Sequence, residues 1–124
     1  MNNDVIFTGC ISEERLRALY HACDLNLFPV EEQTYGLVPF EALASGKLSL
    51  VSVESGAGIL MDRLGICYPI RPDVESIVNA VFDVWKHPGR FEEAISRGRD
   101  YVKKTLRWEY YAEKVLEVYE AVCN

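Results

Sequence analysis

Short apolar runs alternate with helix-like patterns over the first 70 residues of the chain. Four of these runs, at residues 5–8, 25–28, 48–53 and 66–70, have the length and composition of buried strands. The segments between them repeat apolar residues every three or four positions, which is the period of a helix packed on one face. Strands and helices in alternation predict a parallel sheet covered on both faces, so we expect an α/β fold of three layers.

Residues with known capping preferences mark where the helices begin and end. Ser12 precedes the first helical segment and Asp73 precedes the fourth, as expected of N-caps. Pro39 lies in the first turn of the second helical segment, which Gly46 closes. Beyond a break at residues 87–89 the helical period continues almost to the end of the chain, so the last third is predicted to be helical.

One edge of such a sheet is the expected place for a ligand, because parallel sheets bind ligands at the carboxyl ends of their strands. Three loops would lie at that edge, at residues 9–12, 30–36 and 54–58. The second of these loops leads directly into an apolar helix that carries one carboxylate. We therefore look for function first in residues 30–46.

The residues around the start of this helix suit a nucleotide. Gly36 permits a positive φ angle and a close approach of ligand to backbone. The N–H groups of Gly36, Leu37 and Val38 have no acceptor within the helix, so they can bind a diphosphate. The carboxylate of Glu41 would repel phosphate, but it can accept hydrogen bonds from two neighbouring ribose hydroxyls. The alternative is that Glu41 faces solvent on a surface helix.

Composition and charge narrow the classes of function. With 124 residues and a net charge of -6, the chain fits one domain and is a poor candidate for nucleic-acid binding. The four cysteines form no C-x-x-C pair, so we expect free thiols in a reducing cytoplasm and no metal site. The basic stretch at residues 97–107 is either a solvated helix face or a contact with an anionic membrane surface or another lobe.

Residues 33–46 read QTYGLVPFEALASG and resemble a known motif. The E-x(7)-E motif of retaining GT-B glycosyltransferases of the "group 1" family typically reads E-G-F-G-L-P-x-x-E-A-M-A-x-G, within the donor-binding domain. Residues 5–29 look like the strand, glycine-containing loop and helix that precede the motif in that family. Residues 52–61 resemble its Gly-Gly turn, and residues 107–122 its closing amphipathic helix. The resemblance implies that residues 1–124 form a Rossmann-like, partial GT-B C-terminal domain that binds a nucleotide-sugar.

The resemblance also implies a role for each matching residue. The second Glu of the motif binds the donor ribose, and in this chain it is Glu41. The first Glu lies near the transferred sugar in the family, and the catalytic candidate at its position in this chain is Gln33. The donor sugar and diphosphate are expected at Thr34, Tyr35, Gly36, Leu37 and Val38, and the base at the loop Gly9, Cys10 and Ile11.

Gln33 is a departure from the family motif. A glutamine can hydrogen-bond a sugar hydroxyl, but it carries no charge and cannot act as a base. Glu32 would supply a carboxylate if the loop carried a one-residue bulge. We expect the exchange to affect handling of the sugar more than binding of the nucleotide.

A second departure concerns the cations that neutralise the diphosphate. In the family the donor domain begins with another strand–helix–strand unit, which carries an Arg and a Lys, and this sequence starts after that region. Lys47 and Arg63 do not match those positions, and the N-terminal lobe that binds the acceptor is also absent from the sequence. We therefore expect the chain alone to bind nucleoside diphosphates weakly, if at all, and to transfer no sugar.

Two functions remain open at this point. Joined to an N-terminal lobe, the domain would serve a hexosyltransferase that moves a sugar from a nucleotide-sugar to an acceptor. This reaction is expected to need no cofactor, because the nucleotide-sugar is itself a substrate. The alternative is a non-catalytic nucleotide-sugar-binding module or partner subunit, which Gln33 favours.

Overall fold

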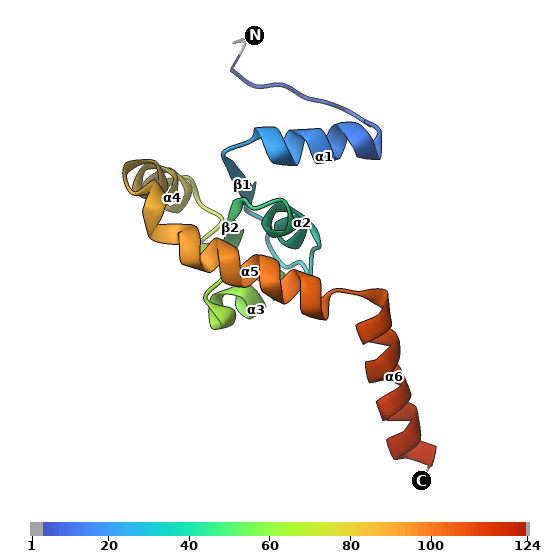
Figure 1. Cartoon of the computed structure of the whole chain (residues 1–124). Helices are drawn as coiled ribbons and strands as arrows, with labels where there is room; N and C mark the ends of the chain where they lie inside the picture. The colour runs from blue at the N-terminus through green and yellow to red at the C-terminus, as the bar shows by residue number, and fades with distance from the viewer. Residues whose placement is uncertain (1–3, 124) are drawn as a thin grey trace.

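The computed structural model describes residues 4–123 and has a three-stranded parallel sheet at its centre (Figure 1). The strands are β1 (Leu25–Phe28), β2 (Leu48–Ser52) and β3 (Tyr68–Ile70), in the order β1-β2-β3. Leu25 lies opposite Leu48, and Leu50 lies opposite Tyr68. All five residues of β2 are buried, as expected of a central strand covered on both faces. The predicted parallel α/β fold is confirmed.

The helices begin at residues that satisfy their first N–H groups. The side chain of Ser12 accepts a hydrogen bond from the N–H of Arg15 at 3.3 Å, and that of Asp73 accepts one from Ser76 at 2.7 Å. Both predicted N-caps are therefore confirmed. In chain order the helices are α1 (Glu13–Ala22), α2 (Val38–Ala44), α3 (Gly56–Leu64), α4 (Val74–Lys86), the 3₁₀ helix η1 (Pro88–Phe91), α5 (Glu92–Thr105) and α6 (Trp108–Cys123).

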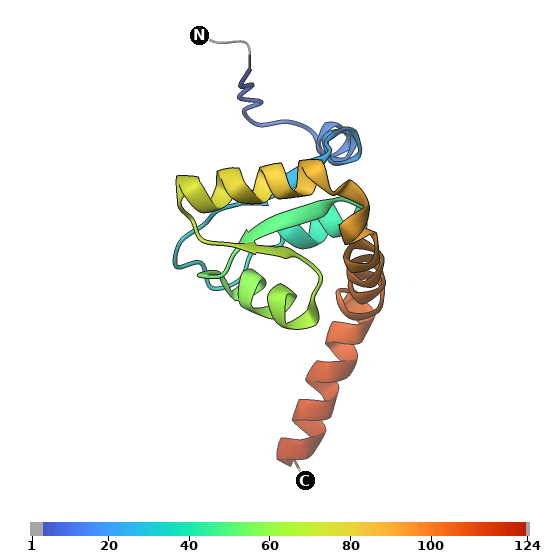
Figure 2. The ribbon, with the colours of Figure 1, turned by 90° about the vertical axis from the view of Figure 1, so that its left-hand side faces the viewer.

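The core is divided into two clusters, one on each face of the sheet. Helices α2 and α3 cover one face and α4 covers the other, which gives the expected three layers (Figures 1 and 2). The cluster under α2 and α3 consists of Phe28, Phe40, Leu43, Val51, Ala57, Met61 and Ile66. The cluster under α4 consists of Leu48, Leu50, Ile70 and Ala80. The apolar runs at residues 25–28 and 48–53 supply strands to both clusters, which is why their composition identified them, although β2 ends at Ser52.

The strand predicted at residues 5–8 is wrong. This segment has no strand conformation and leads away from the sheet towards the N-terminus (Figure 1). Val5, Ile6 and Phe7 are 67%, 83% and 91% exposed. A strand is stable only beside another strand, and within residues 4–123 no strand lies next to this segment. The apolar composition of residues 5–8 therefore favours burial, but the rest of residues 4–123 does not bury this segment.

The last predicted helix forms, but the described residues leave most of it exposed. Helix α6 projects away from the layers in both views (Figures 1 and 2). Trp108 is 83% exposed and Val122 is 77% exposed. Its amphipathic period predicted a covered face, whereas little of residues 4–107 packs against it.

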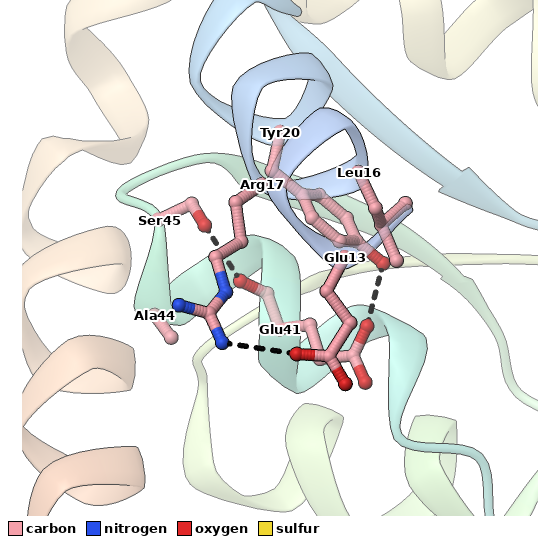
Figure 3. A pocket seen from close by; sticks show the side chains of 7 residues that line it. All are labelled: Glu13, Leu16, Arg17, Tyr20, Glu41, Ala44 and Ser45. Carbon is pink, nitrogen blue, oxygen red and sulfur yellow. Dashed lines mark hydrogen bonds and ion pairs between the residues drawn. The ribbon is translucent and has the colours of Figure 1, made fainter. Parts of the chain in front are cut away.

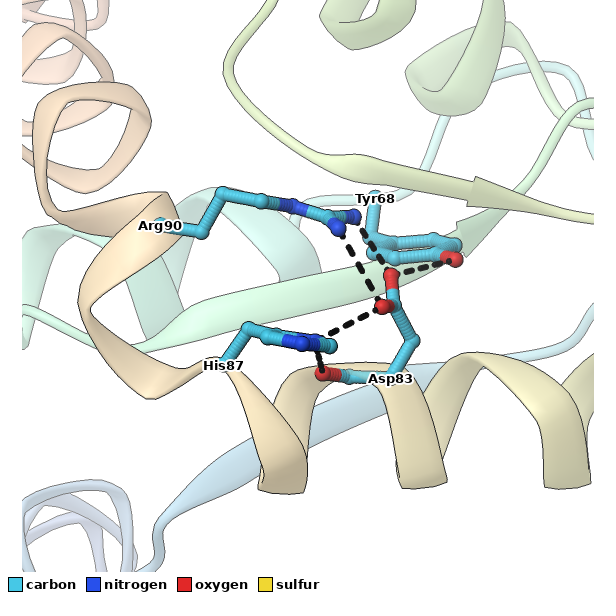
Figure 4. A network of polar contacts seen from close by, with 4 residues as sticks. All are labelled: Tyr68, Asp83, His87 and Arg90. Carbon is cyan, nitrogen blue, oxygen red and sulfur yellow. Dashed lines mark hydrogen bonds and ion pairs between the residues drawn. The ribbon is translucent and has the colours of Figure 1, made fainter.

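A polar network joins α4 to β3 and η1 (Figure 4). The carboxylate of Asp83 accepts hydrogen bonds from the Tyr68 hydroxyl at 3.1 Å and from both terminal nitrogens of Arg90, and His87 Nδ1 lies 3.1 Å from it. Partial burial opposes the charge of Asp83, but the hydrogen bonds from Tyr68 and Arg90 outweigh it and lower the pKa of the carboxyl. Each member has a partner within the network, so we interpret the network as a structural contact that joins α4, β3 and η1.

Candidate functional site

The loop that precedes α2 is held in place by the start of α3. The N–H of Gly56 donates to the carbonyl of Gln33 at 2.9 Å, and the N–H of Ala57 donates to the carbonyl of Tyr35 at 3.3 Å. A Cβ atom on Gly56 would lie 1.8 Å from the carbonyl oxygen of Thr34, so only glycine allows this approach. The loop's carbonyl groups are thus directed towards α3, at the carboxyl end of β1.

Gly36 has both a positive φ angle and a side chain packed too close for a Cβ atom, and each of these favours glycine. Its φ angle is +112°, which confirms the predicted positive φ, and a Cβ atom there would lie 2.6 Å from the ring of Phe28. Helix α2 begins directly afterwards, with the N–H groups of Phe40 and Glu41 donating to the carbonyl of Leu37 at 2.9 and 3.0 Å. Within residues 4–123 the N–H groups of Gly36, Leu37 and Val38 donate to no acceptor, so they are free for a ligand.

The side chains predicted to surround the sugar lie on this same loop. The amide nitrogen of Gln33 lies 3.7 Å from the position of a Cβ atom on Gly36, so residue 33 faces the start of α2. The ring of Tyr35 stacks on Phe40, with ring centroids 5.5 Å apart, and this fixes the loop to the helix. Glu32 has a φ angle of +50°, a strained value for a residue with a side chain, and its carboxylate is exposed.

Glu41 lies on the exposed face of α2 and is engaged by α1. Its Oε2 atom accepts a hydrogen bond from the Tyr20 hydroxyl at 2.9 Å (Figure 3). Both side chains line a pocket of about 380 Å³ between α1 and α2, whose lining residues are Glu13, Leu16, Arg17, Tyr20, Glu41, Ala44 and Ser45. Partial burial and the bond to Glu41 raise the pKa of Tyr20 to about 12, so its phenol remains a proton donor at neutral pH.

The loop predicted to bind the base lies at the start of α1. Gly9 has a φ angle of +60°, and Gly9 and Cys10 are exposed. Ile11 is two residues before Glu13, which lines the pocket that contains Glu41. Within residues 4–123 no strand precedes this loop, so it does not follow the carboxyl end of a strand as expected, and its contact with the base stays a prediction.

Sequence reasoning missed the polar residues that α1 contributes to the pocket, which are Glu13, Arg17 and Tyr20. Tyr20 belongs to the apolar stripe of its helix, and nothing in the local pattern connects it with a carboxylate 21 residues away. Arg17 is a cation in the pocket, and its guanidinium lies 3.3 Å from Glu13. Both partners of that ion pair are largely exposed, so the pair contributes little to stability.

No group of three or more His, Cys, Asp or Glu side chains within residues 4–123 could hold a metal ion. In the same part of the chain, no helix has both the length and the apolar character needed to span a membrane.

Comparison with known proteins assigns the family. A profile of the family described as "Glycosyl transferases group 1" matches residues 1–87. The chain belongs to the group 1 glycosyltransferases. In fold, it resembles sucrose-phosphate synthase from Thermosynechococcus elongatus, with a TM-score of 0.83 and 24% identity over 98% of this chain and 31% of that one. This likeness confirms the expected architecture of a GT-B C-terminal domain.

The curated relatives that the chain matches are much longer than the chain. It is 29% identical to an uncharacterized glycosyltransferase of Methanocaldococcus jannaschii, over 97% of this chain and 31% of the relative. It is 28% identical to glycogen synthase of Mycobacterium tuberculosis, over 93% and 28%. It is 32% identical to the GDP-mannose-dependent alpha-(1-6)-phosphatidylinositol dimannoside mannosyltransferase of Mycobacterium tuberculosis, over 89% and 28%. The chain thus spans less than a third of each of these relatives.

Proposed function

We propose that the chain is the donor-binding portion of a retaining hexosyltransferase, which transfers a sugar from a nucleotide-sugar to an acceptor when joined to an N-terminal acceptor-binding lobe. The observation that carries this proposal lies at the start of α2. Three free N–H groups there are followed, one helical turn later, by a carboxylate that lines a pocket. Membership of the group 1 glycosyltransferases supports the same function.

We assign each part of the donor to a separate group of residues. The N–H groups of Gly36, Leu37 and Val38 bind the diphosphate, because they are free and Gly36 lets the oxygens approach closely. Glu41 accepts hydrogen bonds from the ribose hydroxyls. The transferred sugar lies near Gln33, Thr34 and Tyr35, and the base lies against the loop Gly9, Cys10 and Ile11.

The reaction in this proposal needs no cofactor, because the nucleotide-sugar is consumed and leaves as a nucleoside diphosphate. The chain on its own binds that diphosphate weakly and transfers no sugar, since residues 30–38 contain no Arg or Lys to neutralise the departing diphosphate. We place the protein in the cytoplasm, where its free cysteines remain reduced.

Contact with a membrane surface has less support than contact with a nucleotide. Arg97, part of the basic stretch on α5, donates to the carbonyl of Gly65 at 2.8 Å and lies 3.8 Å from Glu93. That use of its guanidinium favours the interpretation of the stretch as a helix face with structural contacts.

One observation favours the alternative of a non-catalytic binding module. Gln33 occupies the position of a family carboxylate, and its side chain makes no hydrogen bond within residues 4–123. A binding module would hold the nucleotide-sugar through Glu41 and the free N–H groups without promoting transfer.

The test is a titration of the isotope-labelled 124-residue chain with UDP, GDP and ADP, followed by NMR. We expect shifts at residues 36–38 and 41, with dissociation constants in the millimolar range. Glu41→Ala removes the partner of two ribose hydroxyls and should weaken binding roughly ten- to a hundredfold. Glu120→Ala, an exposed residue on α6, is the matched control and should leave binding unchanged.

Three outcomes would contradict parts of the proposal. Absence of shifts at residues 36–41 in about 20 mM of each nucleotide, well above the expected dissociation constants, would remove the nucleotide site. Equal binding by Glu41→Ala and Glu120→Ala would remove the ribose role. Turnover of a nucleotide-sugar by the purified chain would contradict its predicted inactivity.

A further inference from the structure

We infer that Tyr20 is a positioning residue for the ribose-binding carboxylate of Glu41. This inference rests on the proposed function, and it assigns a specific role to a residue outside the E-x(7)-E segment. The Tyr20 hydroxyl would hold one oxygen of Glu41 in place, so that the other oxygen faces the pocket where the ribose binds.

The contact between these two side chains joins two separate helices. Tyr20 lies near the end of α1 and Glu41 in the middle of α2, 21 positions apart in the chain. The hydroxyl and Glu41 Oε2 are 2.9 Å apart, an ordinary distance for a phenol that donates to a carboxylate. Figure 3 shows the two groups pointing towards one another across the space between the helices.

Glu41 needs such a partner because nothing else among the described residues restrains its carboxylate. The residue is exposed, and its neighbours Phe40, Ala42 and Leu43 direct their side chains into the core instead. The side chain of a free glutamate samples many rotamers, and ordering it opposes ligand binding. Tyr20 has a half-buried ring and few rotatable bonds, so it can hold the carboxylate in one orientation.

The bond to Tyr20 leaves enough acceptor capacity for the ribose. A carboxylate has about four lone-pair sites on its two oxygens, and the phenol occupies one of them on Oε2. Both ribose hydroxyls can therefore donate to Oε1 and to the remaining site on Oε2. The phenol stays protonated at neutral pH, so it remains a donor to Glu41 and places no negative charge beside the ribose hydroxyls.

The opposite role for Tyr20 gives the opposite result on substitution. If the phenol occupied the place that a ribose hydroxyl takes, the ligand would have to displace it, and its removal would strengthen binding. If it positions Glu41, its removal frees the carboxylate and weakens binding. Tyr20→Phe keeps the ring and removes only the hydroxyl, so the sign of its effect decides between the two.

The experiment compares Tyr20→Phe with Tyr68→Phe in the 124-residue chain. Tyr68 is a matched control, because its hydroxyl also donates to a carboxylate, that of Asp83 at 3.1 Å, in the network between α4 and β3. The probes are UDP, GDP and ADP, with inorganic pyrophosphate as a probe without ribose. NMR titration gives the dissociation constant of each.

Tyr20→Phe should weaken binding of the tightest of the three nucleotides about five- to tenfold, the factor expected from freeing one glutamate side chain. It should leave the affinity for pyrophosphate unchanged, since the backbone N–H groups of residues 36–38 are untouched. Tyr68→Phe should leave both affinities unchanged. In the Glu41→Ala background, Tyr20→Phe should cause no further loss.

The inference is overturned if Tyr20→Phe binds nucleotide as well as or better than the parent chain, or if it loses affinity for pyrophosphate to the same extent. These outcomes are distinct from failure of the proposed function. If the proposed function is wrong, Glu41→Ala binds nucleotide as well as the parent does, or the parent binds no nucleotide.

Discussion

Gly36→Ala tests the packing that shapes the proposed diphosphate loop. The alanine would have to adopt a φ angle of +112°, which costs about 1–2 kcal/mol for a residue with a Cβ atom. Its Cβ atom would also lie 2.6 and 2.8 Å from two ring atoms of Phe28, a side chain that is 9% exposed and packed in the core. Overpacking of this kind costs about 1–3 kcal/mol.

Together these two costs predict a loss of about 2–5 kcal/mol in the free energy of unfolding, a large part of the ~5–15 kcal/mol of a typical domain. At a urea dependence of about 1.5 kcal/mol/M, the unfolding midpoint should fall by about 1–3 M. Circular dichroism during urea unfolding measures this midpoint. Gly46→Ala is the matched control, because Gly46 also has a positive φ angle, +78°, but the nearest atom to its Cβ position is 3.8 Å away.

The control should therefore lose only the backbone cost of about 1–2 kcal/mol. If both variants unfold at the same urea concentration, Phe28 yields without cost and the argument for a required glycine at residue 36 fails. If Gly36→Ala is as stable as the parent chain, the positive φ angle is also refuted as a source of strain.

Three further predictions concern the loop before α2, the polar network around Asp83, and Gln33. Gly56→Ala places a Cβ atom 1.8 Å from the carbonyl oxygen of Thr34, so it should displace the loop and abolish the nucleotide-induced NMR shifts at residues 36–38. The pKa of Asp83 is lowered in the folded chain, so its carboxylate stabilises the fold above the unfolded pKa near 4, and this stabilisation is lost as the pH falls through the folded pKa. In urea unfolding from about pH 6 to about pH 2.5, the free energy of unfolding should therefore fall more steeply for the parent than for Asp83→Asn. Gln33→Glu should leave the affinity for nucleoside diphosphate nearly unchanged, and in a protein completed by an acceptor lobe it should raise sugar transfer, whereas unchanged transfer would favour the binding-module alternative.

The sheet could be predicted wherever burial and strand pairing coincide. The run at residues 25–28 and residues 48–52 of the run at 48–53 are apolar because they lie in the core, and each has a neighbouring strand. The run at residues 66–70 was predicted as a strand throughout, but only Tyr68–Ile70 pairs with β2, since Ile66 is buried at the end of α3 instead. The run at residues 5–8 has a similar apolar composition and no neighbour among residues 4–123, so the same pattern gave a wrong strand there.

In the candidate site, the residues close together in the sequence could be predicted, and the residues brought in by long-range packing could not. Gly36, the free N–H groups and Glu41 lie close together in the sequence, so a turn followed by a helix already places them on one surface. The residues contributed by α1 were not predicted, because their position depends on how α1 packs against α2. Tyr20 in particular has the spacing of an apolar residue, and only the folded chain shows that its hydroxyl meets Glu41.

The way the loop is held explains why binding of nucleotide and transfer of sugar can be separated in this chain. The loop is fastened through its backbone, by the N–H groups of Gly56 and Ala57, and through the ring of Tyr35 on Phe40. The side chain of Gln33 takes part in neither fastening, so the residue type at position 33 can change without moving the N–H groups of residues 36–38. A glutamine there alters the charge beside the sugar and leaves the proposed diphosphate and ribose contacts in place. Slower transfer with retention of nucleotide binding is therefore the expected consequence of this exchange, and the reverse combination would require the loop itself to differ.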